Sequence, residues 1–325
     1  MRYPFHMPIH LPQYDDVLSA ATRIAPHAHV TPVLRSRTLD ALANCTLHFK
    51  AEPFQRTGSF KFRGACNAVW TLDDDNARNG VVTHSSGNHG AALAAAAQTR
   101  GIPCHVVLPD GAVAAKLESI RRLGARLHPC APTIEARERR CAEVQQETGA
   151  VLVHPYTNAS VIAGQGTAAL ELFEAAGTLD ALVTPVGGGG LLGGSAITAA
   201  ARATACRVIG AEPEGAADTF RSLAAGERRI AFVPDTICDG LRGTLGAPNF
   251  ELLRQHAVQV ITVADADTIA AMRLLWQCLK LIVEPSSAIA LAAILKQPER
   301  FAGQCVGVIL SGGNVDLDTL PWSRG

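Results

Sequence analysis

The sequence predicts an α/β protein in which helices cover a parallel sheet, and three observations support this class. From about residue 80, short β-branched runs alternate with longer alanine-rich segments, which is typical of βαβ units. Glycine-rich stretches lie where a predicted strand meets the next predicted helix. Of the 325 residues, 48% are hydrophobic and 18% charged, enough to bury a large core. Ligands in such sheets bind beyond the carboxyl ends of the strands, so we expect the site in those turns.

The predicted elements follow each other regularly along the chain. Short β-branched runs indicate strands, and longer alanine-rich runs indicate helices. Strands are expected at 80–83, 104–108, 181–184, 207–211 and 305–310, and helices at 91–99, 114–123 and 191–202. The segment 213–250 is rich in glycine and proline, and we expect it to be mostly loop.

Charge and cysteine usage narrow the choice of partner. Lys plus Arg and Asp plus Glu both number 29, so no net field favours nucleic acid or an acidic membrane surface. The nine cysteines contain no Cys-x-x-Cys pair and are expected to be reduced packing residues. No basic start followed by an apolar stretch opens the chain, and no apolar run reaches about 18 residues. We therefore expect a cytoplasmic protein that binds a small molecule, not nucleic acid or a membrane.

A run of four glycines, Gly187, Gly188, Gly189 and Gly190, joins a predicted strand to a predicted helix. Residues without Cβ let backbone N–H groups converge on an anion, and a helix N-terminus adds its dipole. The run therefore predicts a phosphate-binding loop. A tight turn without a ligand is the simpler alternative.

A dinucleotide fold is a second alternative for the same loop. Gly188, Gly190 and Gly193 satisfy G-x-G-x-x-G, and Glu212 follows Gly193 by 19 residues at the end of the next predicted strand. A nicotinamide-binding oxidoreductase, however, leaves no role for the lysine and the Ser/Asn segment described next. We therefore rank it below a cofactor with one phosphate and a reactive aldehyde.

Lys61 is the candidate nucleophile. It lies between Phe60 and Phe62, where loss of hydration would lower its pKa and favour the neutral amine that forms a Schiff base. A lysine at a helix start is by itself more often a solvated surface charge.

The segment from Thr83 to Gly90 again joins a strand to an alanine-rich helix. Its Ser hydroxyls, Asn amide and N-terminal N–H groups suit a carboxylate or a phenolic oxygen. Helix capping by Ser85 or Ser86 would explain the serines without any function. No grouping with zinc-ligand spacing surrounds its histidines.

Together these segments resemble the fold-type II pyridoxal-phosphate enzymes, in particular the serine/threonine dehydratase and serine racemase family. The resemblance covers nearly the whole chain and includes phenylserine and hydroxyaspartate dehydratase-like members. It is carried by Gly58-Ser59-Phe60-Lys61, Ser85-Ser86-Gly87-Asn88-His89-Gly90, Val161 to Thr167, the four glycines, Val283-Glu284-Pro285-Ser286 and Ser311 to Asp316.

The resemblance implies a fold and a quaternary structure. Two three-layer α/β/α domains are expected, with the cofactor between them. Residues 1–72 and 157–325 would form the large cofactor-binding domain, and residues 73–156 a small, mobile substrate-binding domain. A homodimer is also expected.

It also implies where pyridoxal 5'-phosphate binds. Lys61 would hold the cofactor as a Schiff base, Asn88 would bond the 3-hydroxyl oxygen of its ring, and Ser311 would face its pyridine nitrogen. A hydroxyl at Ser311 stabilises a pyridinium less than a carboxylate would, which suits prompt β-elimination. The other cofactor-binding residues implied are Phe60, Gly187, Gly188, Gly189, Gly190, Gly240 and Glu284.

The implied reaction converts a β-hydroxy-α-amino acid such as L-threonine or L-serine to a 2-oxo acid and ammonia. Lys61 would remove the α-proton. Racemase-like members have serine at the position of Ser86, where it acts as acid/base on the opposite face, so an amino-acid racemase with side dehydratase activity stays an alternative. Tyr156 adds phenylserine as a candidate substrate, although its ring could instead pack beneath the loop. The substrate-binding residues implied are Ser85, Ser86, Gly87, His89 and Tyr156.

A metal site completes the implied set. Glu212, the Ala216 carbonyl and Asp218 match the racemase-like pattern for Mg²⁺ or Ca²⁺, and oxygen ligands suit such hard cations. Two solvated loop carboxylates are the alternative.

Overall fold

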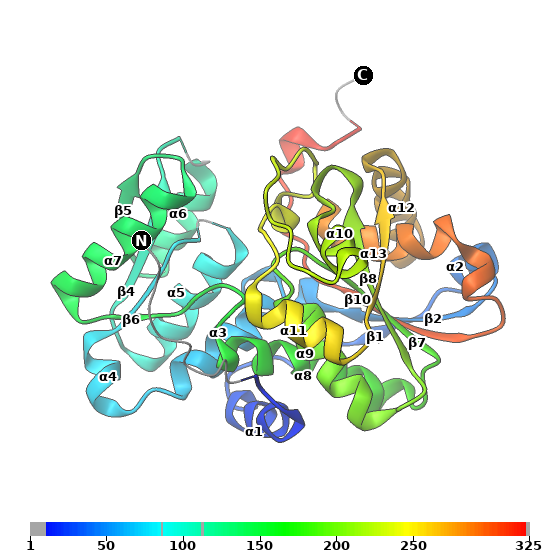
Figure 1. Ribbon diagram of the computed structural model, residues 1–325, viewed down its shortest axis with the longest axis horizontal. Coiled ribbons are helices and arrows are strands. Elements are labelled where there is room, and N and C mark those ends of the chain that lie inside the picture. Colours follow the sequence, from blue (N-terminus) through cyan, green and yellow to red (C-terminus); the bar gives the residue numbers. More distant parts are fainter. Residues whose placement is uncertain (1–10, 86, 112–113, 323–325) are drawn as a thin grey trace.

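The computed structural model describes residues 11–85, 87–111 and 114–322, and it contains two sheets, each covered by helices (Figure 1). The smaller sheet lies at the left of Figure 1 and the larger at the right. The predicted α/β class is therefore confirmed. Among the described residues, no helix has both the length and the apolar character needed to span a membrane.

The larger sheet has six strands in the order β1-β2-β10-β7-β8-β9. These are Val33–Leu34, Thr46–Ala51, Cys305–Leu310, Ala181–Pro185, Arg207–Pro213 and Gln259–Val263. Only β1 pairs antiparallel with its neighbour, and the other pairings are parallel. The carboxyl ends of β7, β8 and β10 therefore meet at one edge, where the glycine loop and Ser311 follow.

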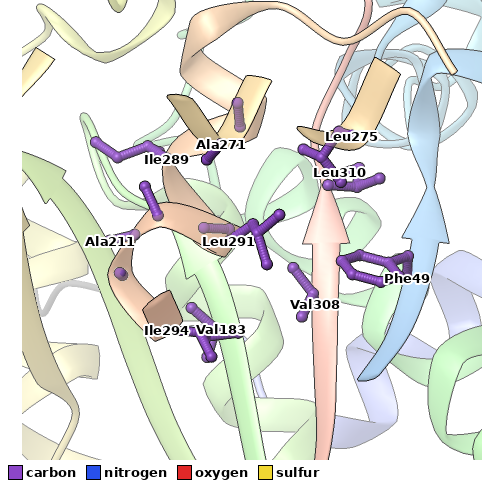
Figure 2. Packing of buried hydrophobic residues seen from close by; sticks show 14 of the residues in the cluster. Phe49, Val183, Ala211, Ala271, Leu275, Ile289, Leu291, Ile294, Val308 and Leu310 are labelled. Carbon is purple, nitrogen blue, oxygen red and sulfur yellow. The ribbon is translucent and has the colours of Figure 1, made fainter. Parts of the chain in front are cut away.

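Helices cover both faces of this sheet. The helices α8, α9, α12 and α13 span Ala159–Ala176, Gly190–Arg202, Asp265–Leu279 and Pro285–Lys296. Side chains alternate between the faces, so Val183 and Val308 pack with Leu291 of α13 (Figure 2), while Leu182 of β7 belongs to the cluster of α8 and α9. Two further helices, α1 (Tyr14–Ile24) and α2 (Arg37–Ala43), flank these layers.

The smaller sheet has four parallel strands in the order β5-β4-β3-β6. They span Arg126–Cys130, Cys104–Pro109, Val81–Thr83 and Val151–Leu152. The helices α4, α5, α6 and α7 span Asp74–Asn79, Asn88–Arg100, Ala114–Arg122 and Ile134–Thr148. All of these elements lie inside residues 73–156, and one further helix, α3 (Lys61–Trp70), packs against both α5 and α8.

Each predicted strand and helix has a counterpart, but the prediction of loop for 213–250 was partly wrong. That segment contains α10 (Asp218–Ala225) and the first residues of α11 (Ala247–Gln255). The Glu212 carboxylate accepts hydrogen bonds from the N–H groups of Thr219 and Phe220 at 2.8 Å each. A cap supplied by the preceding strand stabilises α10, and local glycine and proline content does not reveal it.

Candidate active site

A cavity of about 650 Å³ lies between the two sheets and is lined by residues from both. It brings together residues that are far apart in the sequence but were predicted for one site. Those lining it are Phe60, Lys61, Ser85, Gly87, Asn88, His89, Tyr156, Gly187, Gly188, Gly189, Gly190, Gly240, Glu284 and Ser311. Ser86 lies outside the described residues. The predicted metal ligands Glu212, Ala216 and Asp218 do not line it.

Lys61 is the first residue of α3, and its side chain enters this cavity. The amine lies 5.0 Å from the centre of the Phe60 ring and donates a hydrogen bond to the Pro155 carbonyl at 3.2 Å. Burial lowers the pKa of Lys61 to about 8, and the Glu284 carboxylate partly opposes that shift. The neutral amine, which a nucleophile or base requires, is therefore far more accessible near neutral pH than in a solvated lysine.

The depth of Lys61 in the cavity is fixed by a close approach of α3 to α8. A Cβ on Gly164 would lie 2.6 Å from the Gly64 Cα atom, so only glycine fits this crossing. The Gly64 N–H also donates to the Gln165 side chain at 3.1 Å. Lys61 is thus held three residues before a backbone-to-backbone contact.

The glycine loop has the form of an anion site. It connects β7 to the N-terminus of α9, and Gly189 has a φ of 92°, which disfavours any residue with a Cβ. A Cβ on Gly188 would lie 2.4 Å from the Tyr156 ring. The backbone therefore approaches its neighbours too closely for side chains, and its N–H groups can face a phosphate.

Tyr156 packs on this loop. Its ring also lies edge-on to His154, with ring centres 4.5 Å apart, and burial raises the pKa of its phenol. The ring therefore forms part of the wall behind the glycines while it lines the cavity.

The histidines of the cavity are uncharged. Burial, reinforced by the charge of Lys61, holds the pKa of His89 well below its usual value. Burial likewise lowers the pKa of His154 to about 3. The His154 Nδ1 atom accepts from the backbone N–H groups of Tyr156 and Thr157 at 3.4 and 3.2 Å, so its proton resides on Nε2. The His154 ring can therefore donate from Nε2, whereas the N–H of the neutral His89 ring is used by the Val153 carbonyl at 3.2 Å.

The side of the cavity toward Ser311 is polar. The Asn88 amide donates to both Glu284 oxygens at 3.0 and 3.2 Å. The Ser286 hydroxyl accepts from the Gly240 N–H at 3.0 Å, and the buried Ser311 hydroxyl donates to the Ser286 carbonyl at 3.4 Å. An aromatic ring with a phenolic oxygen at one position and a nitrogen at another would find partners here.

The cavity therefore fits pyridoxal 5'-phosphate on structural grounds. Lys61 could join its aldehyde, the glycine loop could hold one phosphate, and Asn88 and Ser311 lie among the polar groups that could meet the ring. By contrast, Glu212 is fully buried and accepts two N–H groups from α10, so it is not placed to bind a ribose. The dinucleotide alternative was wrong for this reason.

Sequence reasoning missed several residues of the site, and three of them bear on its chemistry. Arg137 and Arg242 line the cavity, and Asn314 bonds Asn88 from outside it. The arginines carry no local signal, because each lies in a segment with several other charges or glycines. Asn314 belongs to the quoted motif Ser311 to Asp316 and could have been singled out there.

Comparisons with known proteins agree with this geometry. Residues 24–312 match the family described as "Pyridoxal-phosphate dependent enzyme". The chain is 49% identical to a β-hydroxyaspartate dehydratase of Paracoccus denitrificans, over 97% of this chain and 100% of that protein. It is 41% identical to an L-threo-3-hydroxyaspartate ammonia-lyase of Saccharomyces cerevisiae, over 94% of both chains.

A solved structure extends the likeness to the fold. The crystal structure of serine racemase from Dictyostelium discoideum superposes with a TM-score of 0.90 at 47% sequence identity, covering 94% of this chain and 99% of that one. The cavity, its lysine and its glycine loop thus occur on a fold that this racemase shares. The chain belongs to the family of pyridoxal-phosphate-dependent enzymes.

Proposed function

We propose that the protein is a dehydratase, or ammonia-lyase, that converts 3-hydroxyaspartate to the corresponding 2-oxo acid and ammonia. The observation that carries this proposal is a cavity holding both the amine of Lys61, whose pKa burial lowers to about 8, and two arginines, Arg137 and Arg242. The hydroxyaspartate-specific names of two relatives support the same substrate class. A substrate with two carboxylates would use both features.

Lys61 is the residue that moves protons. Bound pyridoxal 5'-phosphate withdraws electrons from the α-carbon of an attached amino acid, which acidifies the α-proton. The Lys61 amine would take that proton, because burial lowers its pKa to about 8 and makes its neutral form accessible. Loss of the β-hydroxyl and hydrolysis of the resulting unsaturated amine then release the 2-oxo acid and ammonia.

Other residues orient the substrate. Ser85, Gly87 and His89 lie at the start of α5, where the Ser85 hydroxyl and backbone N–H groups can hold the α-carboxylate. The neutral His89 ring donates its N–H to the Val153 carbonyl at 3.2 Å and would border the carboxylate without donating to it. Ser86, beside them in the sequence, would share that role. We therefore assign the α-carboxylate to the start of α5.

The second carboxylate is assigned to Arg137 on α7. Its Nε donates to the Thr133 carbonyl at 3.4 Å, and its side chain is half-buried at the cavity wall. Within the described residues its Nη atoms have no ion-pair partner. Arg242 is exposed and donates through Nε and Nη2 to the Thr236 carbonyl, which leaves it nearer the rim. Charged hydrogen bonds to a carboxylate are the strong ones, so Arg137 would set the preference for a dicarboxylate.

Replacing Arg137 with leucine tests this assignment. We expect kcat/KM for 3-hydroxyaspartate to fall about 10- to 100-fold, the effect of losing a hydrogen bond to a charged group. Turnover of L-threonine and L-serine should change little, since neither has a second carboxylate. Arg139 on the same helix is exposed and does not line the cavity, so Arg139→Leu is the matched control.

The assay is release of 2-oxo acid and ammonia from the L-threo and erythro forms of 3-hydroxyaspartate, L-threonine, L- and D-serine and L-threo-phenylserine. Chiral analysis of the remaining substrate detects racemisation. Enantiomer interconversion without oxo acid would favour the racemase alternative, and its loss in Ser86→Ala would assign that activity to Ser86. A preference for phenylserine would contradict the dicarboxylate assignment.

We also propose that Glu212, the Ala216 carbonyl and Asp218 bind Mg²⁺ or Ca²⁺. Both carboxylates are buried, and burial raises the pKa of Glu212 to about 7 and that of Asp218 to about 6. The Asp218 Oδ1 atom is buried without a hydrogen-bond partner among the described residues. Among the residues that the structure describes, no group of three His, Cys, Asp or Glu side chains could hold a metal ion. Water molecules would therefore complete the coordination shell of the cation.

A cation at this site should stabilise the folded protein. At 100 times its Kd, Mg²⁺ or Ca²⁺ is expected to add about 2.7 kcal/mol to the free energy of unfolding relative to EDTA. Asp218→Asn should abolish the gain, whereas Asp267→Asn on the exposed start of α12 should keep it. An equal gain in both variants, measured by thermal unfolding, would refute the site.

Three expectations from the sequence stay proposals: a homodimer, a cytoplasmic location, and movement of residues 73–156 on substrate binding. Light scattering of the purified protein tests the first of these.

A further inference from the structure

We propose that Asn314 is a positioning residue that fixes the orientation of the Asn88 amide toward the cofactor ring. The inference rests on the proposed role of Asn88 at the 3-hydroxyl oxygen of that ring. It does not depend on which hydroxy amino acid the enzyme uses.

A direct hydrogen bond joins the two side chains, which come from the parts of the chain that contain the two different sheets. Asn88 begins α5 beside the smaller sheet, and Asn314 follows β10 of the larger one. The Asn314 Nδ2 atom donates to the Asn88 Oδ1 atom at 2.9 Å and to the Thr57 carbonyl at 2.8 Å. The Asn88 Nδ2 atom in turn donates to the Glu284 carboxylate.

The Thr57 carbonyl and the Glu284 carboxylate, at the two ends of this chain of hydrogen bonds, determine which groups donate and which accept. The Thr57 carbonyl can only accept, so the group of Asn314 that faces it must be the NH₂ group. The second hydrogen of that group meets the Asn88 oxygen, which turns the Asn88 NH₂ group toward Glu284 and the cavity. An ionised Glu284 accepts only, so it agrees with this order. One NH₂ hydrogen of Asn88 can meet Glu284 while the other meets a phenolic oxygen.

The turn before Lys61 is shaped to receive Asn314. Thr57 has a φ of 61°, a left-handed conformation that is strained for a non-glycine residue. Gly58 has a φ of 73°, and a Cβ there would lie 2.4 Å from the Asn314 Oδ1 atom. The strained turn therefore directs a carbonyl at Asn314 and leaves room for its amide. It does so four residues before the reactive lysine.

Replacing Asn314 with the isosteric aspartate puts a hydrogen-bond acceptor where the asparagine has a donor. Asn314→Asp presents an acceptor to both the Thr57 carbonyl and the Asn88 oxygen. Asn88 could satisfy it only by rotating its amide, which would turn its oxygen toward Glu284 and the ring oxygen. Asn314 is itself exposed, so water competes for these bonds, and we expect a loss of affinity but not of folding.

The test measures pyridoxal 5'-phosphate itself. Asn314→Asp is expected to raise the Kd of the apoprotein for the cofactor at least about fivefold, the value of roughly one hydrogen bond. It should also shift the visible absorption band of the loaded protein, because the hydrogen bond to the ring oxygen changes. If Asn314→Asp does not fold, Asn314→Ser, which can donate to only one acceptor, carries the same test.

Asn67 provides a matched control on α3. Its Nδ2 atom donates to the Ser160 carbonyl at 2.8 Å, and its Oδ1 atom accepts from Arg23 at 2.6 Å, but it does not line the cavity. Asn67→Asp should lower the thermal midpoint without moving the absorption band. A lowered midpoint with an unmoved band in Asn314→Asp would overturn the inference, because only a structural role would remain. Asn88→Ala distinguishes the proposed role of Asn88 from that of Asn314. If Asn88→Ala also leaves the absorption band unmoved, the proposed bond between Asn88 and the ring oxygen is refuted.

Discussion

Lys61→Ala is expected to lower kcat by at least about 10²–10⁴-fold, the contribution of a positioned acid/base group. Lys61 lines the cavity, and burial beside Phe60 lowers the pKa of its amine to about 8. Alanine removes the base and the point of attachment together. The fold should persist, because the amine's hydrogen bond goes to a single carbonyl, that of Pro155.

The measurement is steady-state turnover of 3-hydroxyaspartate together with the visible spectrum of the purified variant. Lys296 is the control, since it does not line the cavity. Its amine donates to the Glu214 carboxylate and the Thr262 carbonyl. Lys296→Ala should keep both turnover and spectrum. Turnover within tenfold of the original in Lys61→Ala would remove Lys61 from the mechanism.

Arg63→Met is expected to lower the free energy of unfolding by about 3–5 kcal/mol, as when one partner of a buried ion pair is lost. The Arg63 side chain is fully buried, and its Nε and Nη2 atoms donate to the two Glu52 oxygens at 2.8 and 2.9 Å. Its Nη1 and Nη2 atoms also donate to Glu171 at 2.6 and 2.8 Å. Methionine fills much of the space but leaves the Glu52 carboxylate uncompensated in the interior.

Denaturant unfolding of the apoprotein measures this loss. The double variant Arg63→Met/Glu52→Gln should recover part of the stability, because the uncompensated charge is gone. Arg78 makes an exposed pair with Asp75 at 2.8 Å, and Arg78→Met should change the free energy of unfolding by no more than about 0.5 kcal/mol. A loss below about 1 kcal/mol in Arg63→Met would mean that Lys50, which bonds Glu171 at 2.5 Å, compensates the cluster.

The features predictable from the sequence are those encoded within a few neighbouring residues. Lys61 with its flanking phenylalanines and the glycine loop belong to continuous motifs, so their chemistry could be read directly. The buried ion-pair cluster of Arg63, Glu52 and Glu171 could not be predicted in this way. It joins Arg63 to Glu171, 108 residues away, and nothing local distinguishes these residues from surface charges.

The same limit explains the errors and omissions. The helix α10 is capped by Glu212 from the preceding strand, so its stability comes from outside its own segment. Arg137 reaches the cavity only because α7 packs beside strands of the smaller sheet. Placement of such side chains depends on how the two sheets meet, and that is a property of the whole fold.

The glycine crossing of α3 and α8 bears on how this enzyme can diverge. The position of Lys61 is set by main-chain atoms in contact at Gly64 and Gly164, not by the sizes of surrounding side chains. Apolar residues elsewhere in the core can therefore be exchanged over evolutionary time while the reactive amine keeps its place. Such a scaffold can acquire new substrate preferences through its rim residues, with the central chemistry inherited unchanged.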